Sequence, residues 1–312
     1  MTQNSFSKNI LITGGTVFVS RYAAKYYTEK GYHVYVLNRN TRPQPKGVTL
    51  IEADRHHLDD RLRDYHFDAV LDITAYTAED ISSLLSALGS YDAYILISSS
   101  AVYPEYAPQP FTENTKTGAN KFWGNYGIQK IDAEQILLER KPDAYILRPP
   151  YLYGPMNHIY REAFLFDCAL NSRKFYLPQD GEMKLQFFHV NDLCRFMDIL
   201  LEKRPKQHIF NVGNKETISV LDWVTLCYQL LGKHAAFFHV PENIEQRKYF
   251  SFYNYEYYLD IGEQARWMPE TKPLRDGLQE SLEWYLAHPE SISRKPYMAY
   301  IDNQLKSILN IL

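Results

Sequence analysis

The chain has 312 residues, which leaves room for one large domain or two at roughly 100–200 residues per domain. Its net charge of −3 and pI near 6.4 give no basic footprint, and this argues against nucleic acid or an anionic membrane as the main partner. Hydrophobic residues make up 45% of the chain, and no apolar run approaches the roughly 20 residues that cross a bilayer. These values predict a soluble globular protein.

The N-terminus and the cysteines bear on the compartment and on two kinds of site. Apolar character begins at Ile10 and gives way at once to Gly14 and Gly15, so we expect no secretory segment and a cytoplasmic protein. The cysteines are odd in number and lack the close pairing of zinc motifs. They are Cys168, Cys194 and Cys227. We therefore expect neither disulfides nor a metal site.

Apolar runs rich in Ile, Val and Leu alternate with helical patterns in the first half of the chain. Six runs are expected strands: NILIT (9–13), HVYVLN (33–38), VTLIEA (48–53), DAVLDIT (68–74), AYILISS (93–99) and AYILRP (144–149). An amphipathic segment lies between most of them, which is typical of right-handed crossovers in a doubly wound α/β fold. The sequence therefore predicts a Rossmann-type parallel sheet in residues 1–150.

Residues 151–312 contain shorter elements and predict a smaller, mixed α/β lobe that binds the substrate. The expected elements are a helix near 158–172, strands at KFYLP (174–178) and FFHV (187–190), a helix at 191–203, and HIFNVG (208–213). No low-complexity linker separates the two parts, so we expect close packing, with some later segments returning to the first domain. Ligands of such sheets bind at the carboxyl ends of the strands, which predicts a cleft between the lobes.

The turn after the first strand, TGGTVFVS (13–20), has the pattern of a dinucleotide-binding turn with two of its glycines replaced. In such a turn the first glycine makes the bend, the second lets the backbone approach a pyrophosphate, and the third packs helix on strand. Gly14 keeps the bend, whereas Val17 and Ser20 occupy the other two positions. The N–H groups and dipole of a helix N-terminus still attract phosphate, so we expect weakened binding. The alternative is a Rossmann-like protein with a vacant pocket.

Polar residues after the second and third strands bear on the choice of cofactor. An acidic residue after the second strand would hold a ribose 2′-hydroxyl, whereas an arginine pairs with a 2′-phosphate. Asn38 and Arg39 stand there and favour NADP over NAD. The alternative is that Arg39 is a solvated loop arginine. Asp54 and Arg55 follow the third strand, where an adenine edge could be met.

A Tyr-x-x-x-Lys spacing occurs twice in the chain. Tyr126 and Lys130 lie one helical turn apart, so both side chains can share a face. Tyr26 and Lys30 have the same spacing on what should be the outer surface of the first helix, and we interpret that copy as incidental. The context favours Tyr126, because it begins a helix after a strand that ends in three serines.

These residues suit proton exchange with a substrate hydroxyl. An ammonium beside a phenol favours phenolate, so we expect Lys130 to lower the pKa of Tyr126 from its reference of about 10. Ser99 would orient the reacting oxygen. Lys130, reaching a cofactor ribose as well, would link proton transfer to hydride transfer.

Together these motifs resemble the extended short-chain dehydrogenase/reductases, the NAD-dependent epimerase/dehydratase family, over most of the chain. The matching segments are TGGTVFVS, SSSAVY, YGIQK, RPPYLYGP, FFHVNDL, FNVGN and LRDGLQESLEWY. The resemblance implies Tyr126 as the acid/base, Lys130 as its activator, and Ser99 as the serine at the family's distance from Val102-Tyr103. It also implies a cofactor-binding set: Gly14, Gly15, Thr16, Phe18, Val19, Asn38, Arg39, Asp54, Arg55, Ala75, Tyr76, Tyr126, Lys130 and Pro149. The chain looks closest to the branch of chloroplast stem-loop-binding proteins and their bacterial relatives, some of which are linked to RNA.

Three departures from the family pattern concern the substrate. Tyr151 stands where nucleotide-sugar members commonly have asparagine, and Leu185 and Gln186 stand where they have Arg-Asp. An arginine fork is the usual partner of a diphosphate, so its loss argues against ordinary UDP-sugar epimerisation. Lys184 or Arg173 could substitute as point charges. The substrate stays unassigned beyond a sugar-like hydroxyl or carbonyl.

Two functions of different class follow. The first is an NAD(P)-dependent epimerase/dehydratase-like oxidoreductase that uses Ser99, Tyr126 and Lys130. The second is a dinucleotide-responsive RNA-binding or regulatory protein without turnover. We favour the enzyme, because hydride chemistry requires such a constellation, whereas an RNA binder needs a basic surface with aromatic side chains.

The helix from Tyr126 to about Arg140 carries apolar residues that bear on assembly. They are Ile128, Ile131, Ile136 and Leu137. Relatives commonly pair such helices in a homodimer, and internal packing explains the four residues equally well.

Overall fold

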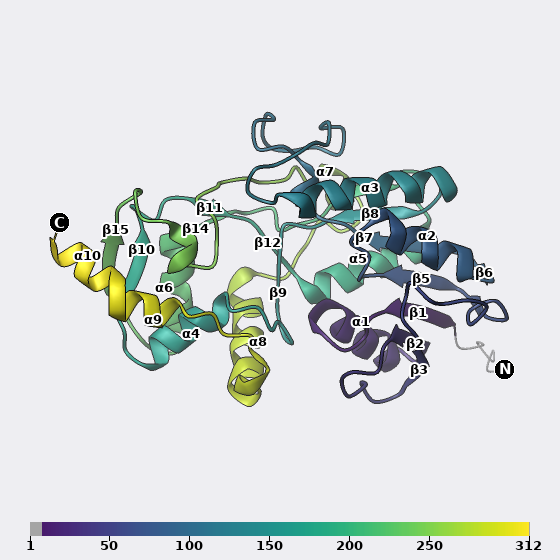
Figure 1. Ribbon diagram of the computed structural model, residues 1–312, viewed down its shortest axis with the longest axis horizontal. Coiled ribbons are helices and arrows are strands. Elements are labelled where there is room, and N and C mark those ends of the chain that lie inside the picture. The colour runs from purple at the N-terminus through teal and green to yellow at the C-terminus, as the bar shows by residue number, and fades with distance from the viewer. Residues whose placement is uncertain (1–7, 312) are drawn as a thin grey trace.

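A seven-stranded parallel sheet forms the centre of the protein, in the order β13-β8-β7-β5-β1-β2-β3 (Figure 1). The computed structural model describes residues 8–311. The strands are β1 (Asn9–Thr13), β2 (His33–Asn38), β3 (Val48–Glu52), β5 (Ala69–Asp72), β7 (Tyr94–Ile97), β8 (Tyr145–Arg148) and β13 (Ile209–Asn211). All the strands expected in residues 1–150 are present. The strand order reverses between β1 and β5, as in doubly wound folds.

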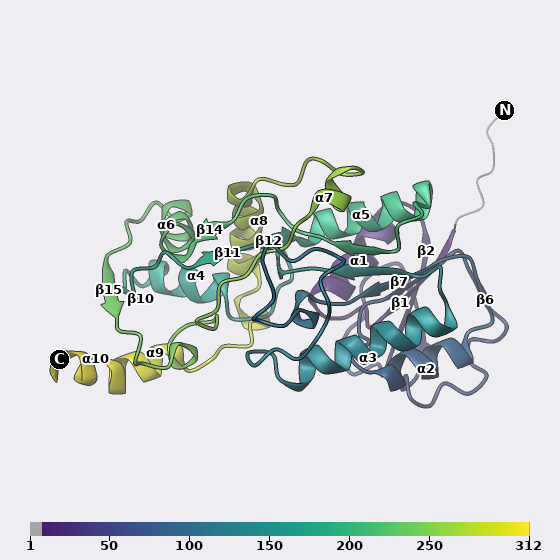
Figure 2. The same cartoon turned by 90° about the horizontal axis from the view of Figure 1, so that it is seen from above.

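Helices cover both faces of the sheet (Figure 2). Successive side chains of a strand point to opposite faces, so Ile10 and Ile12 of β1 pack in the core under α1 and α5, and Leu11 packs in the core under α2 and α3. Burial on both faces explains why these strands read as continuous apolar runs. The helices are α1 (Phe18–Glu29), α2 (Ala78–Ala87), α3 (Asn125–Arg140) and α5 (Val190–Lys203).

Two later segments return to the sheet. The segment HIFNVG, predicted as part of the smaller lobe, contains β13, which pairs with β8 and places Ile209 opposite Ile146. Helix α5 then packs against α1. The physical reason is that β8 would otherwise present an unpaired edge, and β13 covers it. The sheet is therefore completed by chain from beyond residue 150.

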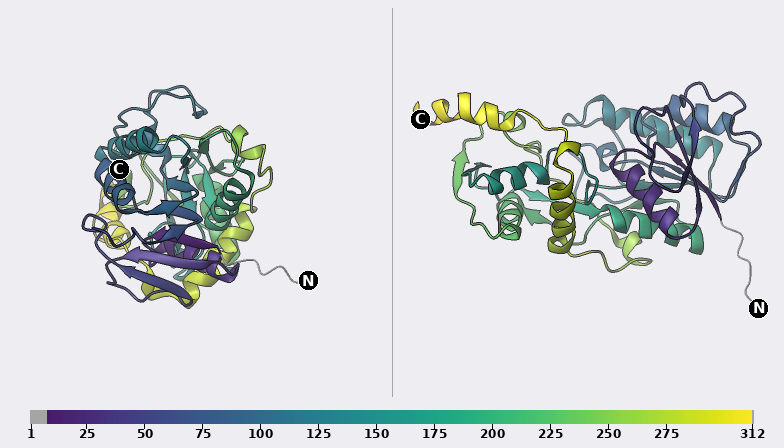
Figure 3. Two further views of the ribbon diagram at one scale, coloured as in Figure 1. Left: turned by 90° about the vertical axis from the view of Figure 1, so that its right-hand side faces the viewer. Right: turned by 90° about the horizontal axis from the view of Figure 1, so that it is seen from below.

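The smaller lobe extends from one side of the sheet, with the C-terminal helices at its far end (Figure 3). Its core is rich in buried aromatic rings, among them Phe187, Trp223 and Phe250. Its strands and helices are β9 (Tyr151–Tyr153), α4 (Glu162–Leu170), β10 (Phe175–Pro178), β11 (Lys184–Leu185), β12 (Phe187–His189), β14 (Ile218–Ser219), α6 (Val220–Leu230), β15 (Phe237–Val240), α8 (Leu274–Ala287), α9 (Tyr297–Tyr300) and α10 (Lys306–Ile311). No helix within residues 8–311 combines the length and the apolar character that crossing a bilayer requires.

Short elements fill the connections. These are β4 (His66–Phe67), β6 (Ser90–Tyr91), η1 (Ser100–Val102), η2 (Gln246–Lys248), α7 (Gly262–Ala265), η3 (Pro289–Ser291) and η4 (Ile301–Leu305). The long loop between η1 and α3 packs against a returning segment near residue 259. There the Phe111 N–H donates to the Tyr258 carbonyl at 3.0 Å, and the Asp260 N–H donates to the Phe111 carbonyl at 2.8 Å. This contact closes one side of the region between the sheet and the lobe.

Helix α3 buries part of its apolar face inside the protein. Ile131 is 9% exposed and Leu137 is fully buried, whereas Ile128 is 38% exposed. Internal packing therefore accounts for Ile131 and Leu137. A homodimer through this helix stays a prediction.

We expect Gly127→Ala to destabilise the protein by forcing α3 away from η1. A Cβ at Gly127 would lie 2.4 Å from the carbonyl oxygen of Ala101. Alanine in a helix normally stabilises by about 1 kcal/mol relative to glycine, but overpacking against backbone costs roughly 1–3 kcal/mol. We therefore expect the free energy of unfolding in urea to fall by about 1 kcal/mol or more.

Gly118→Ala is the matched control for this measurement. Its Cβ would lie 3.6 Å from Pro104, an ordinary contact, so its stability should change by no more than about 0.5 kcal/mol. Equal stability of the two variants would mean that α3 does not depend on close approach to Ala101.

Candidate functional site

The turn between β1 and α1 keeps two glycines that its backbone requires. Gly14 and Gly15 have φ values of +89° and +92°, which residues with a side chain rarely adopt. A Cβ on Gly15 would also lie 2.5 Å from Val36. The Asn38 Nδ2 donates to the Gly14 carbonyl at 2.6 Å, and the Gly14 N–H donates to the Leu37 carbonyl at 2.8 Å. Asn38 thus holds the turn against β2.

Val17 and Ser20, which replace the other glycines, leave the N-terminus of α1 uncapped. Val17 is the extended N-cap residue, with φ −133°, and no side chain accepts from the first turn. Ser20 is 3% exposed and its hydroxyl donates to the Val17 carbonyl at 2.9 Å. The first turn also lacks an acidic residue. Its N–H groups therefore stay available to an anion.

Two cavities follow the carboxyl edge of the sheet, and Thr74 and Tyr76 line both. The larger, of about 460 Å³, runs from the N-terminus of α1 into the smaller lobe, and the smaller, of about 330 Å³, lies at the ends of β1, β2 and β3. The larger is lined by six of the predicted site residues besides Ser99: Phe18, Val19, Tyr76, Tyr126, Lys130 and Pro149. The smaller is lined by Gly14, Asn38, Arg39, Asp54, Arg55 and Tyr76. Gly15, Thr16 and Ala75 border neither cavity.

Arg39 and Asp54 lie beside each other in the smaller cavity. Arg39 is exposed, and its guanidinium forms no ion pair with any carboxylate of residues 8–311. The pKa of Asp54 lies below its usual value, first because the His56 N–H donates to its carboxylate at 3.0 Å and also because positive charges, including Arg39, lie near it. The cavity thus presents an unpaired guanidinium at the end of β2.

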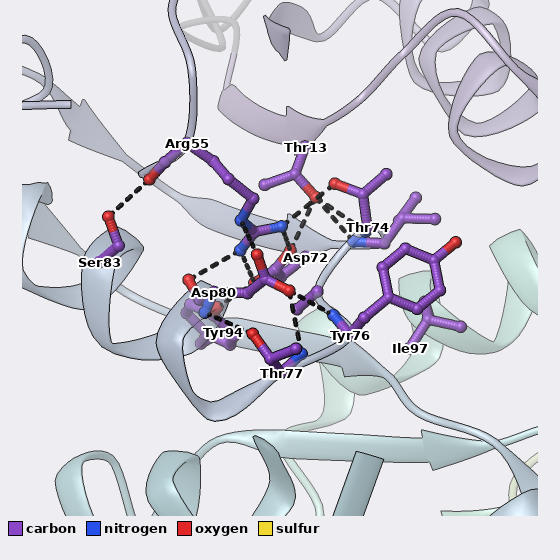
Figure 4. Close-up of polar contacts among 12 residues, drawn as sticks. Thr13, Arg55, Asp72, Thr74, Tyr76, Thr77, Asp80, Ser83, Tyr94 and Ile97 are labelled. Atoms are coloured by element: carbon purple, nitrogen blue, oxygen red, sulfur yellow. Dashed lines mark hydrogen bonds and ion pairs between the residues drawn. The ribbon is translucent and has the colours of Figure 1, made fainter. Parts of the chain in front are cut away.

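Arg55 lies in a buried ion-pair network beneath the smaller cavity (Figure 4). Its Nη2 is 3.1 Å from the Asp72 carboxylate and its Nε is 3.1 Å from Asp80. Asp72 is fully buried and also accepts from the hydroxyls of Thr13 at 2.7 Å and Tyr94 at 2.6 Å. A buried carboxylate is costly without a charged or hydrogen-bonding partner, so the Arg55 guanidinium stabilises the folded protein by pairing with these two acids. Its expected contact with adenine stays a prediction.

Ser99, Tyr126 and Lys130 line the same cavity. Ser99 follows β7, and its hydroxyl oxygen accepts the Ala101 N–H at 3.1 Å, which fixes the side chain at the start of η1. The same hydroxyl lies close enough to the Tyr126 phenol to lower its pKa. The fold therefore brings the predicted hydroxyl and phenol together.

The serines beside Ser99 serve other parts of the fold. Ser98 donates to the buried carboxylate of Glu134. Ser100 donates to the Tyr257 hydroxyl at 3.1 Å. Of the three consecutive serines, Ser99 is therefore the one that meets Tyr126.

Partial burial raises the pKa of Tyr126, which is 37% exposed, above its usual value, and the neighbouring Ser99 hydroxyl opposes that rise. We predicted the opposite direction, from a Lys130 ammonium beside the phenol. The difference arises because the Lys130 Nζ turns to the backbone, donating to the carbonyls of Ala75 at 2.6 Å and Ile97 at 2.9 Å. At neutral pH the phenol therefore holds its proton.

Lys130 is enclosed within the protein. It is 3% exposed, and burial lowers the pKa of its ammonium to about 8, although the nearby carboxylates of Asp72 and Glu134 oppose that effect. The ring of Tyr76 lies over the Lys130 Nζ, and its centroid is 5.0 Å from that atom. The centroids of the Tyr76 and Tyr126 rings are 6.2 Å apart. The Tyr76 ring thus contacts both the Lys130 ammonium and the Tyr126 ring.

The second Tyr-x-x-x-Lys copy joins two helices. The Tyr26 hydroxyl donates to the Asp198 carboxylate at 2.6 Å, and the Lys30 Nζ bonds the same carboxylate. Asp198 belongs to α5, so this pair lies on the side of α1 that packs against α5. Neither residue lines the cavities described above.

The part of the larger cavity in the smaller lobe contains two arginines that sequence reasoning missed. Arg161, 9% exposed, donates from Nη2 to the Leu152 carbonyl at 3.1 Å, while its buried Nε has no partner among residues 8–311. Arg247 lies far along the chain, in η2, and lines the same cavity. The guanidinium of Arg161 is 5.6 Å from the ring centroid of Tyr151, and that of Arg247 is 4.7 Å from Tyr253. No motif marks either arginine.

The residues that we proposed as substitutes for a diphosphate clamp lie elsewhere. Arg173 pairs with Asp302 at 2.7 Å, and Lys184 is exposed outside the cavity. Gln186 is 2% exposed, and its amide donates to the Asn214 carbonyl at 2.8 Å. The position where nucleotide-sugar members carry the clamp therefore faces the interior.

Known proteins resemble the chain in both sequence and fold. It is 26% identical over 310 residues to the chloroplast stem-loop binding protein of 41 kDa b of Arabidopsis thaliana, across 89% of this chain and 79% of that protein. The fold matches dTDP-glucose 4,6-dehydratase of Bacillus anthracis, determined with NAD, at TM-score 0.73 and 19% identity over 92% of this chain and 99% of that one. It also matches UDP-glucuronic acid 4-epimerase of Bacillus cereus, determined with UDP-glucuronic acid and NAD, at TM-score 0.70 and 20% identity over 89% and 99%.

A family match covers the part of the chain that forms the main sheet. It begins within β1 and ends just after β13, the seventh strand of the main sheet. It includes the glycine turn, the serines after β7 and the Tyr-x-x-x-Lys pair of α3. With residues 10–213 matched, the chain belongs to the NAD dependent epimerase/dehydratase family.

Proposed function

We propose that the protein is an NAD(P)-dependent oxidoreductase or epimerase that acts on a sugar-like hydroxyl or carbonyl. The observation that carries this proposal is that Ser99, Tyr126 and Lys130 line one cavity beginning at the uncapped N-terminus of α1. The backbone N–H groups of α1 would hold a pyrophosphate, and Arg39 would hold a ribose 2′-phosphate, which favours NADP. A bound nicotinamide supplies or accepts the hydride.

Tyr126 is the proton donor and acceptor in this proposal. Because burial raises its pKa, the phenol is protonated at neutral pH and gives its proton to a substrate carbonyl oxygen as the carbonyl carbon is reduced. In the reverse direction the phenolate takes the proton from a hydroxyl. Ser99 orients the same oxygen through its hydroxyl, while Lys130, which lines the same cavity, binds the backbone carbonyls of Ala75 and Ile97 beside it.

Two arginines support a substrate that carries a negative charge. Arg161 has a buried Nε without a partner, and Arg247 makes no ion pair with the described carboxylates. Guanidinium groups bind phosphate oxygens through paired hydrogen bonds. A protein of the same fold was determined with UDP-glucuronic acid, a sugar that carries phosphate groups. We infer a phosphate-bearing sugar as the substrate class here.

RNA binding is the second candidate, and the likeness to a stem-loop binding protein over 89% of the chain favours it. This function does not need the phenol proton of Tyr126. The two candidates therefore respond differently to a change at that residue.

Tyr126→Phe should remove most of the turnover, because it deletes the proton that the reaction needs. We expect turnover to fall roughly 10²–10⁴-fold, while affinity for the dinucleotide changes by no more than about 2-fold. Product formation from UDP-glucose, UDP-glucuronic acid and dTDP-glucose, followed by chromatography with NADP or NAD present, measures this.

Tyr106→Phe is the matched control, since Tyr106 is 80% exposed and lies outside both cavities. Wild-type turnover that survives in Tyr126→Phe would contradict the role given to the phenol. Salt-dependent RNA binding that persists in Tyr126→Phe, with no turnover in the wild type, would favour the second candidate.

Arg39→Ala should weaken NADP binding more than NAD binding, because only NADP carries the 2′-phosphate. Hydrogen bonds to charged groups contribute about 1.5–3 kcal/mol, so the NADP dissociation constant should rise roughly 10–100-fold in calorimetric titration. Arg63→Ala is the control, because Arg63 is exposed, pairs with Asp60 at 2.7 Å and borders neither cavity. A wild-type preference for NAD would refute this role of Arg39, and no binding of either dinucleotide would refute the enzyme.

Arg247→Ala should weaken binding of a nucleoside diphosphate. With UDP as the probe, we expect the dissociation constant to rise roughly 10-fold or more, because one guanidinium partner of the phosphates is lost. Lys248→Ala removes a neighbouring cation that pairs with Glu245 at 3.2 Å and faces away from the cavity, so it should leave UDP binding unchanged. If both variants weakened UDP binding equally, the contribution of Arg247 would be one of general surface charge and not of direct contact with the phosphates.

A further inference from the structure

The ring of Tyr76 stands where the two cavities meet. Tyr76 lines both of them and is 52% exposed, although it follows the fully buried Ala75. Its ring points away from the Asp72 and Asp80 network, on the side of Ile97 (Figure 4). A dinucleotide that spans the smaller and the larger cavity would have to pass this side chain.

Hydrogen bonds hold the backbone at Tyr76, but within residues 8–311 none holds its side chain. The Tyr76 N–H donates to the Asp80 carboxylate at 2.7 Å, and the preceding carbonyl, that of Ala75, accepts from Lys130 at 2.6 Å. The phenol hydroxyl of Tyr76, by contrast, makes no hydrogen bond with any residue from 8 to 311. The ring can therefore rotate about its side-chain bonds without breaking a hydrogen bond or moving the chain.

The same ring covers the ammonium of Lys130. A lysine has three N–H donors, and two of these bind the carbonyls of Ala75 and Ile97. The Tyr76 ring lies over the same Nζ, with its centroid 5.0 Å away, and is the neighbour that the third donor meets. In this arrangement Lys130 has no donor left for a cofactor ribose.

We propose that the Tyr76 ring is a movable partition, which covers Lys130 and must turn aside for a dinucleotide to occupy both cavities. The identity of the ligand rests on the proposed function, whereas the covering of Lys130 does not. Tyr76 then acts as a specificity residue: ligands confined to the smaller cavity bind with the ring in place, and dinucleotides bind only after it moves. The displaced ring gives up its contact with the ammonium, which lowers dinucleotide affinity.

Calorimetry with Tyr76→Ala and Tyr76→Phe tests the partition. The probes are NADP, NAD and adenosine 2′,5′-bisphosphate, the last of which fills only the adenosine end. We expect Tyr76→Ala to bind the dinucleotides on the order of 3- to 10-fold more tightly than the wild type, with bisphosphate binding unchanged. Tyr76→Phe keeps the ring and should behave as the wild type. Dinucleotide affinity in Tyr76→Ala that is equal to or weaker than in the wild type would overturn the proposal.

Labelling of Lys130 tests the cover without any cofactor. Acetic anhydride followed by peptide mass spectrometry should modify Lys130 several-fold faster in Tyr76→Ala than in the wild type or Tyr76→Phe, with exposed Lys248 as the internal reference. Unchanged labelling in Tyr76→Ala would overturn the partition, whether or not dinucleotides bind. Faster labelling with no dinucleotide binding in any variant would uphold the cover over Lys130 and instead remove the proposed function.

Discussion

A buried ion pair between α3 and β8 sets the position of the candidate site. Glu134 and Arg148 are each 4% exposed, the Arg148 Nε donates to the Glu134 carboxylate at 3.0 Å, and the Nη2 bonds its second oxygen. Ser98 donates to the same carboxylate. Glu134 lies one helical turn beyond Lys130 on α3. Its bonds to Arg148 of β8 and to Ser98, the residue before Ser99, therefore fix the rotation of α3 against the sheet. Losing one partner of a buried pair costs about 3–5 kcal/mol, so the arrangement is strongly maintained.

The glycine replacements at the start of α1 affect the fold and the ligand differently. Ser20 fits because Gly14 lacks a side chain: a Cβ on Gly14 would lie 2.9 Å from the Ser20 hydroxyl. That hydroxyl also donates a hydrogen bond to the Val17 carbonyl, and a glycine at this position could not make that bond. Val17 instead faces the larger cavity. The fold therefore tolerates both replacements, and any loss of phosphate affinity arises at Val17.

Local patterns predicted the sheet, because each strand is buried on both faces and reads as an apolar run whatever its partners. They also placed Ser99 and Tyr126 in one cavity, since strand ends of a parallel sheet share an edge. They predicted that some later segments return to the first domain, but not that β13 is one of them or that Arg161 lines the cavity. These outcomes depend on contacts between distant segments. The direction of the Tyr126 pKa was missed for the same reason, because side-chain spacing along a helix does not reveal which carbonyls a lysine will meet.

The two Tyr-x-x-x-Lys copies show what turns a spacing into a site. At the end of α1 the carboxylate of Asp198, from α5, binds both Tyr26 and Lys30, so their polar atoms are used within the protein.

Around Lys130 the nearby carboxylates are already occupied. Asp72 is paired with Arg55, and Glu134 with Arg148. With both acids paired to arginines, Lys130 forms no ion pair within residues 8–311, and its partners there are two carbonyls and the ring above it. Tyr126 likewise meets a hydroxyl rather than a charge. The surrounding arginines thus leave the phenol and the ammonium without an acidic partner among the described residues, which the spacing of tyrosine and lysine alone does not achieve.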